Sequence, residues 1–150
     1  LFAACMKAGA LSAGAGEEEA EYARLFGEYI GLCFQIKDDI FDYYESAQIG
    51  KPTGNDMLEG KLTLPALYAL NSTHDKQAED LALKVKNGTA TAEEIASLIE
   101  FSKLSGGIEY SMRVMAGFKE KALALLSSLA DTNVKRALAC YLDYVVEREK

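Results

Sequence analysis

Four polar side chains share one face of an expected helix, and together they supply a carboxamide and three carboxylates. They are Gln35, Asp38, Asp39 and Asp42, at positions i, i+3, i+4 and i+7. Carboxylates at this spacing repel each other, and no Lys or Arg at i±4 on that face offsets them. Mg²⁺ prefers such oxygen ligands and usually shares its shell with water and substrate phosphates. We call these four residues the acidic stripe. The stripe predicts a metal site that also binds a phosphate, and the alternative is a solvated acidic helix face.

A polar stretch after this stripe carries the next candidates. Between residues 45 and 61 the apolar periodicity lapses, and the stretch is interrupted by Gly50, Pro52, Gly54 and Gly60. Glycines let the backbone approach a ligand closely, and Lys51 and Lys61 add compact positive charges. These parts suit a diphosphate held opposite a carboxylate-bound metal, although either lysine taken alone fits an ordinary surface residue better.

Helices are the elements expected to position these groups. The 150 residues include two prolines and no tryptophan, and 49% of them are hydrophobic, which favours an all-α fold class. Apolar residues recur at steps of three and four along the helix that should carry the stripe, at Tyr22, Phe26, Tyr29, Cys33, Ile36 and Ile40. Helices are predicted over 1–15, 17–44, 63–70, 72–86 (capped by Ser72 or Thr73), from a Thr91–Glu94 capping box onward, 108–130 and 133–148.

The net charge and the cysteine spacing limit the classes of binding partner and the cellular location that the sequence predicts. A formal net charge of −7 argues against nucleic acid and against an anionic membrane surface. The apolar opening, residues 1–15, is too short to be a transmembrane segment. Three widely spaced cysteines without a C-x-x-C pair indicate reduced thiols and a cytoplasmic location.

At the stripe and its loop the sequence resembles the trans-type isoprenyl (polyprenyl) diphosphate synthases. Their second aspartate-rich motif, F-Q-x-x-D-D-x-x-D, matches residues 34–42, and the following loop matches G-K-P-T-G-N-D at 50–56 and E-G-K-L-T-L-P at 59–65. The resemblance covers essentially the whole chain. It implies that residues 1–150 are the carboxyl-terminal half of a single domain, the isoprenoid synthase helical bundle, with the amino-terminal half absent. Apolar periodicity that is already present at Leu1, with no helix cap before it, agrees with this interpretation.

The resemblance also assigns roles to residues. Asp38 and Asp42 would bind the Mg²⁺ that bridges an allylic diphosphate, and Asp39 and Asp56 would support that metal directly or through water. Lys51 and Lys61 would hold the departing diphosphate. Phe34 and Gln35 would face the substrates.

The implied activity is a Mg²⁺-dependent prenyltransferase of isoprenoid biosynthesis. It would condense an allylic diphosphate with isopentenyl diphosphate into a longer linear polyprenyl diphosphate, in an enzyme that is a homodimer when complete. Because the first aspartate-rich motif of the family precedes the region seen here, we expect the 150 residues alone to be inactive. Two alternatives remain: a non-catalytic regulatory subunit related to these synthases, and a class I terpene cyclase.

Overall fold

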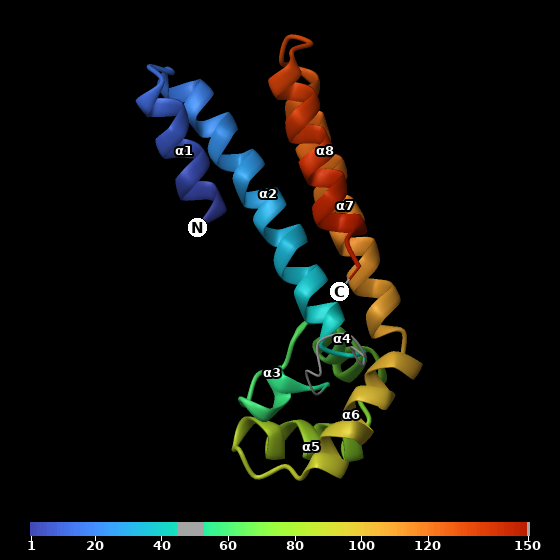
Figure 1. Ribbon diagram of the computed structural model, residues 1–150. Coiled ribbons are helices and arrows are strands. Elements are labelled where there is room, and N and C mark those ends of the chain that lie inside the picture. The colour runs from blue at the N-terminus through green and yellow to red at the C-terminus, as the bar shows by residue number, and fades with distance from the viewer. Residues whose placement is uncertain (45–52, 150) are drawn as a thin grey trace. The chain divides into compact units, whose positions relative to one another are not determined.

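A computed structural model of the chain describes residues 1–44 and 53–149 (Figure 1). The described residues form helices and no strand, which confirms the all-α fold class. The helices are α1 (Phe2–Ser12), α2 (Glu17–Phe41), α3 (Asn55–Leu58), α4 (Leu64–Thr73), α5 (Lys76–Lys86), α6 (Ala92–Leu104), α7 (Gly107–Ser127) and α8 (Asn133–Glu147). None of these described helices is both long and apolar enough to cross a bilayer.

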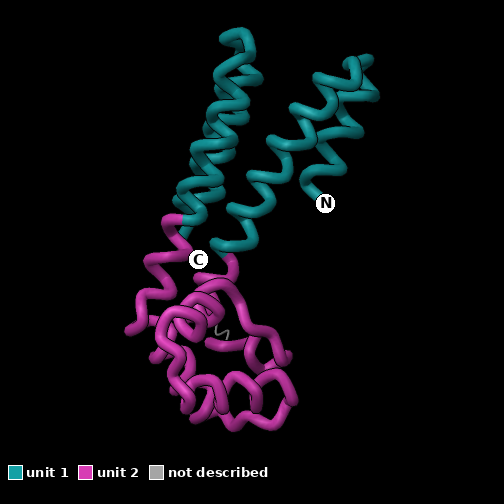
Figure 2. Tube along the Cα trace, turned by 180° about the vertical axis from the view of Figure 1, so that it is seen from behind, with its two compact units in different colours: residues 1–37, 114–149 teal, residues 38–113, 150 magenta. Residues whose placement is uncertain are grey.

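The chain divides into two compact units, and two helices take part in both (Figure 2). The first unit comprises residues 1–37 and 114–149, and the second contains the described residues between 38 and 113. The boundary falls inside α2 and again inside α7, so neither helix belongs to one unit alone. The aspartate-rich segment is therefore the place where α2 leaves the first unit and enters the second.

The first unit packs α1, α2, α7 and α8 around apolar side chains. Its buried residues include Phe26, Ile30, Cys33, Ala122, Leu126, Leu142 and Val145. Close approach of α1 to α2 depends on glycine, because a Cβ added at Gly27 would lie 2.6 Å from the backbone oxygen of Phe2. The prediction for the buried face of α2 is correct at Phe26 but wrong at Tyr22, whose side chain is 48% exposed.

The second unit packs α4 and α5 against α6, and its core contains Tyr43, Pro65, Ala66, Ala69, Val85, Leu98 and Ile108. The start of α7 passes very close to α4. A Cβ at Gly107 would lie 2.3 Å from the Pro65 oxygen and 2.8 Å from the Ser102 oxygen, both of them backbone atoms. Glycine is therefore the residue type that lets α7 begin there.

Helix boundaries agree with the sequence in some places and differ in others. The Thr91–Glu94 capping box opens α6 as predicted, with both reciprocal hydrogen bonds present. The cap of α5 is Asp75, whose carboxylate accepts from the Ala78 amide, so the prediction of Ser72 or Thr73 as the cap is wrong. The predicted loop between residues 45 and 61 contains the short helix α3 in its described part.

Candidate functional site

The aspartate-rich segment lies at the carboxyl-terminal end of α2, as predicted. The backbone amide of Asp42 still donates to the Asp38 oxygen at 3.2 Å, which continues the helical pattern one residue beyond the end of α2. The apolar side of the segment is buried at Ile36 and Ile40. On its polar side, Gln35 is exposed and the three aspartates are half-buried. One helix face is thus apolar and the other carries the carboxylates.

Asp42 fastens the loop that follows to the end of α2. One carboxylate oxygen accepts from the Asn55 amide at 3.1 Å, and the other accepts from the Asp56 amide at 3.0 Å. The Asp42 backbone oxygen accepts from the Gly54 amide at 2.9 Å. These contacts satisfy the first free backbone donors of α3, as a helix cap does. The structure therefore gives Asp42 a capping role that sequence reasoning missed.

Gly54 makes this turn possible. Its φ is +79°, in the left-handed region that favours glycine. A Cβ at this position would also lie 2.8 Å and 2.9 Å from side-chain carbons of Ile95 and Ile99. The chain can therefore pass between α6 and the end of α2 only where a residue has no side chain.

Lys61 lies at the end of the same turn and forms an ion pair. Its backbone amide donates to the Asp56 oxygen at 2.8 Å, and its ammonium donates to the Glu59 carboxylate at 2.6 Å. The hydrogen bond and charge of Glu59 raise the pKa of Lys61 above its ordinary value. Since the ammonium is exposed and charged at neutral pH, an anionic ligand can replace Glu59 as its partner. The structure thus brings three predicted site residues, Asp42, Asp56 and Lys61, into one hydrogen-bonded turn.

Tyr43 forms hydrogen bonds at the start of α4, a role that sequence reasoning missed. Its side chain is buried, and its hydroxyl oxygen accepts from the Ala66 amide at 3.2 Å and lies 3.2 Å from the Thr63 hydroxyl. Burial raises the pKa of Tyr43 to about 12. The Thr63 side chain makes no cap hydrogen bond to α4, so Tyr43 serves one of the free amides at the start of that helix. A tyrosine on the apolar face of a helix is the signal that could have indicated this, because a buried hydroxyl needs a partner.

The substrate-facing candidates Phe34 and Gln35 belong to the first unit. Both line a hollow of about 390 Å³ with Phe2, Gly27 and Gly31. The Phe34 ring contacts the Phe2 ring, with centroids 5.5 Å apart and planes tilted by 41°. The two candidates thus border the same open space, at the start of the segment that continues to the aspartates.

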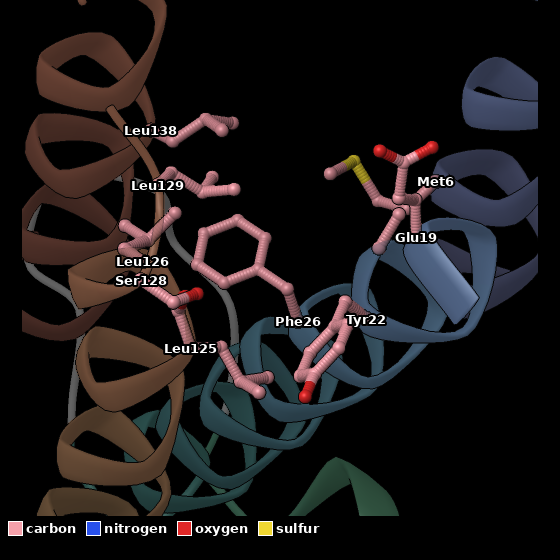
Figure 3. Close-up of a pocket in the computed structure, with 10 residues that line it drawn as sticks. Met6, Glu19, Tyr22, Phe26, Leu125, Leu126, Ser128, Leu129 and Leu138 are labelled. Carbon is pink, nitrogen blue, oxygen red and sulfur yellow. The ribbon is translucent and has the colours of Figure 1, made fainter. Parts of the chain in front are cut away.

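A second hollow in the first unit is strongly apolar. It has a volume of about 210 Å³ and is lined mainly by Met6, Phe26, Leu125, Leu126, Leu129 and Leu138. Figure 3 shows the Phe26 side chain pointing from α2 toward Leu126 and Leu129. Surfaces of this kind accept hydrocarbon and exclude water.

The carboxylates do not form a ready-made metal cage. In the part of the chain that the structure describes, no three His, Cys, Asp or Glu side chains are close enough together to hold a metal ion. The donors that are present, half-buried aspartates on one helix face, still suit Mg²⁺, which commonly takes one or two protein carboxylates and completes its shell with water and phosphate oxygens. Lys51, the other predicted diphosphate ligand, lies outside the described residues.

Comparison with known proteins places this arrangement in a family. The polyprenyl synthetase family model matches residues 1–102. Heptaprenyl diphosphate synthase component 2 of Bacillus subtilis is 35% identical over 150 residues, which are 99% of this chain and 42% of that protein. The chain thus spans less than half the length of this curated relative.

Solved structures agree in fold and in extent. The crystal structure of geranylgeranyl pyrophosphate synthase from Bacteroides thetaiotaomicron superposes with a TM-score of 0.94 at 65% identity, over 98% of this chain and 48% of that one. Polyprenyl synthase from Caulobacter crescentus, complexed with calcium and isoprenyl diphosphate, gives a TM-score of 0.86 at 30% identity, over 99% and 46% of the two chains. The chain, with its aspartate-rich helix end and the turn that Asp42 fastens to it, belongs to the polyprenyl synthetase family.

Proposed function

We propose that a complete synthase containing this chain condenses an allylic diphosphate with isopentenyl diphosphate to give a longer linear polyprenyl diphosphate. The observation that carries this proposal is the pair of hydrogen bonds from Asn55 and Asp56 to the Asp42 carboxylate. They fasten the end of the aspartate-rich helix to the turn that leads to Lys61. Carboxylates and an ammonium group are therefore carried by one hydrogen-bonded turn. The names of similar proteins, a heptaprenyl diphosphate synthase and a geranylgeranyl pyrophosphate synthase, support the same reaction class.

We infer that Asp38 holds Mg²⁺, with Asp39, Asp42 and Asp56 supporting it directly or through water. Bound Mg²⁺ would neutralise the diphosphate whose bond to the allylic carbon breaks. Asp42 can take part while capping α3, because each carboxylate oxygen has a second lone pair. The presence of calcium with isoprenyl diphosphate in the Caulobacter crescentus enzyme supports a divalent cation in the family site.

The chain's own residues have separate tasks in this proposal. The ammonium groups of Lys51 and Lys61 take up the negative charge that develops on the departing diphosphate. Phe34 and Gln35 face the substrates, and apolar side chains keep water from the allylic cation. The double bond of isopentenyl diphosphate then attacks the allylic carbon, and loss of a proton restores a double bond in the lengthened chain.

The assembly is also a proposal. We propose that the complete enzyme is a cytoplasmic homodimer, which the family resemblance and three free cysteines support. The name "component 2" of the Bacillus subtilis relative makes a second, different subunit the alternative to test. The 150 residues alone should not catalyse the reaction, because they carry one of the family's two aspartate-rich motifs.

The test is turnover of farnesyl diphosphate plus labelled isopentenyl diphosphate by the full-length protein, with and without Mg²⁺. Linear products are expected, and Asp38→Ala should lower kcat by about a hundredfold or more. Asp80→Ala, at an exposed aspartate of α5, is the control and should retain activity. Cyclic hydrocarbons would indicate a terpene cyclase, and stimulation of another subunit without turnover would indicate a regulatory protein. Mg²⁺-dependent turnover by the 150 residues alone would contradict the expectation for the isolated chain.

A further inference from the structure

Arg148, the residue directly after α8, contacts the first residue of the aspartate-rich segment in two ways. A terminal guanidinium nitrogen of Arg148 donates to the backbone oxygen of Phe34 at 3.2 Å. The central carbon of the same guanidinium lies 4.2 Å from the centre of the Phe34 ring. A planar guanidinium can lay its flat face on a ring while its N–H groups donate in the plane, and an ammonium has no such flat face. One side chain therefore contacts both the backbone and the ring of Phe34, across 114 residues of sequence.

A second neighbour of the Phe34 ring, Phe2, is fixed by close helix packing. Phe2 contacts the ring, with 5.5 Å between centroids. A Cβ at Gly31 would lie 3.3 Å from the Phe2 Cβ, and one at Gly27 would overlap the Phe2 backbone. Because α1 cannot shift toward α2, Phe2 is a firm neighbour for Phe34. The orientation of the ring thus depends on two segments from opposite ends of the sequence.

Arg148 also lies near Lys37, a second cation on this turn of α2. Burial lowers the pKa of Lys37, and the nearby positive charge of Arg148 lowers it further. These two cations repel each other, although Glu149 opposes the effect on Lys37. Arg148 is also held by its own helix, because its Nε donates to the Val145 oxygen at 3.3 Å. The ring contact and the two backbone hydrogen bonds thus hold the guanidinium at Phe34 and at the end of α8.

We propose that Arg148 is a positioning residue that holds the Phe34 ring in its substrate-facing orientation. The inference rests on the proposed prenyl transfer, in which Phe34 faces the substrates. Its consequence is that the end of α8 supports the start of the aspartate-rich segment from a distance in sequence. Arg148 acts through Phe34, and the effect of replacing it should depend on whether Phe34 is present.

The contact itself can be tested without any assay of activity. 4-Fluorophenylalanine at position 34 of the full-length protein gives a ¹⁹F resonance that reports the ring's surroundings. Arg148→Lys should move this resonance, because lysine keeps the charge and loses the planar face. Arg136→Lys, at an exposed arginine of α8 that pairs with Asp131, is the matched control and should leave the resonance in place. An unchanged resonance in Arg148→Lys would overturn the proposal.

The consequence for the reaction is tested by steady-state kinetics on the full-length protein. Arg148→Lys and Arg148→Ala should each lower kcat by about tenfold with a smaller change in KM, because a displaced ring misplaces bound substrate. In a Phe34→Leu background, Arg148→Ala should add no further loss. Full activity in Arg148→Lys would mean that the charge of Arg148 alone matters. If the losses of Phe34→Leu and Arg148→Ala multiplied in the double variant, Arg148 would act independently of Phe34. Either result would overturn the proposal.

Two further measurements distinguish a failure of the Arg148 proposal from a loss of fold and from a failure of the proposed function. Thermal unfolding of each variant identifies any loss of fold, and Arg148→Lys, which keeps most of the side chain, then provides the kinetic test. If the unaltered full-length protein does not transfer prenyl groups, the proposed function fails, while the ¹⁹F comparison still decides whether Arg148 positions the ring.

Discussion

The carboxylate of Asp42 and the backbone amide of Asp56 lie 3.0 Å apart, joined by a hydrogen bond between the end of α2 and the start of α3. The second carboxylate oxygen makes the equivalent bond to Asn55 at 3.1 Å. Spacing along the sequence indicates a metal ligand at this position, and the geometry adds a capping role in the fold. The turn that carries Asp56 and leads to Lys61 therefore depends on the residue that ends the acidic stripe.

Asp42→Asn should destabilise the protein even in metal-free buffer. Asparagine keeps one acceptor oxygen and places an NH₂ donor against a backbone N–H, so one amide of α3 loses its partner. A loss of about 1–2 kcal/mol is expected, which lowers Tm by roughly 2–8 °C for a domain of this size. Thermal unfolding with excess EDTA measures it, with the exposed Asp80→Asn as the control. A Tm that falls only when Mg²⁺ is present would show that Asp42 acts through the metal alone.

Tyr43→Phe should cost about 1–2 kcal/mol of stability, because the Ala66 amide and the Thr63 hydroxyl lose a buried partner. The ring is retained, so packing changes little. Urea unfolding measures the loss, and Tyr144→Phe, whose side chain is 64% exposed, should change stability by much less. Equal stability of the two variants would mean that the Tyr43 hydroxyl does not hold the start of α4.

Cys33 should react slowly with alkylating reagents in the folded protein. It is fully buried, and burial raises its pKa to about 11, partly offset by the nearby Lys119 charge. At pH 8 roughly one molecule in a thousand then carries the thiolate, the form that reacts with alkylating reagents. With Cys5 and Cys140 replaced by Ser, iodoacetamide should label Cys33 slowly in buffer and quickly in urea. Similar rates in both conditions would contradict burial of this thiol.

The same shift affects stability at alkaline pH. An unfolded cysteine loses its proton near pH 9, whereas folded Cys33 keeps its proton until about pH 11. The folded state therefore binds more protons than the unfolded state within this window, and its stability should fall as pH rises from about 9 to 11. Cys33→Ala removes this contribution, so its stability curve should be flatter over the same range in urea titrations. Parallel curves for the two proteins would count against the raised pKa.

Two glycines of α7 should respond to alanine in opposite directions. Gly107→Ala forces a Cβ against the Pro65 backbone oxygen, which cannot move aside as a side chain can, so a loss of about 1–3 kcal/mol or more is expected. Gly117 has no atom within 4 Å of an added Cβ. Gly117→Ala should therefore stabilise the helix by roughly 0.5–1 kcal/mol. Chemical denaturation of both variants checks the contrast, and similar losses would mean that the close approach at Gly107 does not limit packing.

Local signals in the sequence predicted what local contacts determine. The Thr91–Glu94 box was predictable because both of its partners lie within one helical turn. Ser72 and Thr73 were the predicted caps of α5, and Asp75, a further residue type that caps helices, lies only two residues after Thr73. In the structure, the Thr73 hydroxyl bonds back to the Ala69 oxygen and remains in α4, which leaves Asp75 to cap α5.

The missed features depend on residues that meet through the fold. The stripe on α2 was predictable because helical spacing alone sets it. The amides that Asp42 serves lie 13 and 14 residues further on, and the hydroxyl of Tyr43 meets Thr63 20 residues away. The contact between Arg148 and Phe34 joins the two sequence segments of the first unit. The side-chain types indicate that these residues need hydrogen-bond partners. Which residues serve as partners depends on the fold, because they are distant in sequence.

The division inside α2 and α7 sets an order for folding during translation. Residues 38–113 form one uninterrupted stretch, so the ribosome delivers nearly all of the second unit before residue 114 of the first unit is made. Residues 1–37 are therefore made before the α7 and α8 residues of their unit, and Phe26 at first lacks Leu126, with which it lines a hollow. A nascent chain in this state exposes apolar surface of the kind that chaperones bind. Completion of the first unit, including the contact with Arg148, therefore follows synthesis of the second unit.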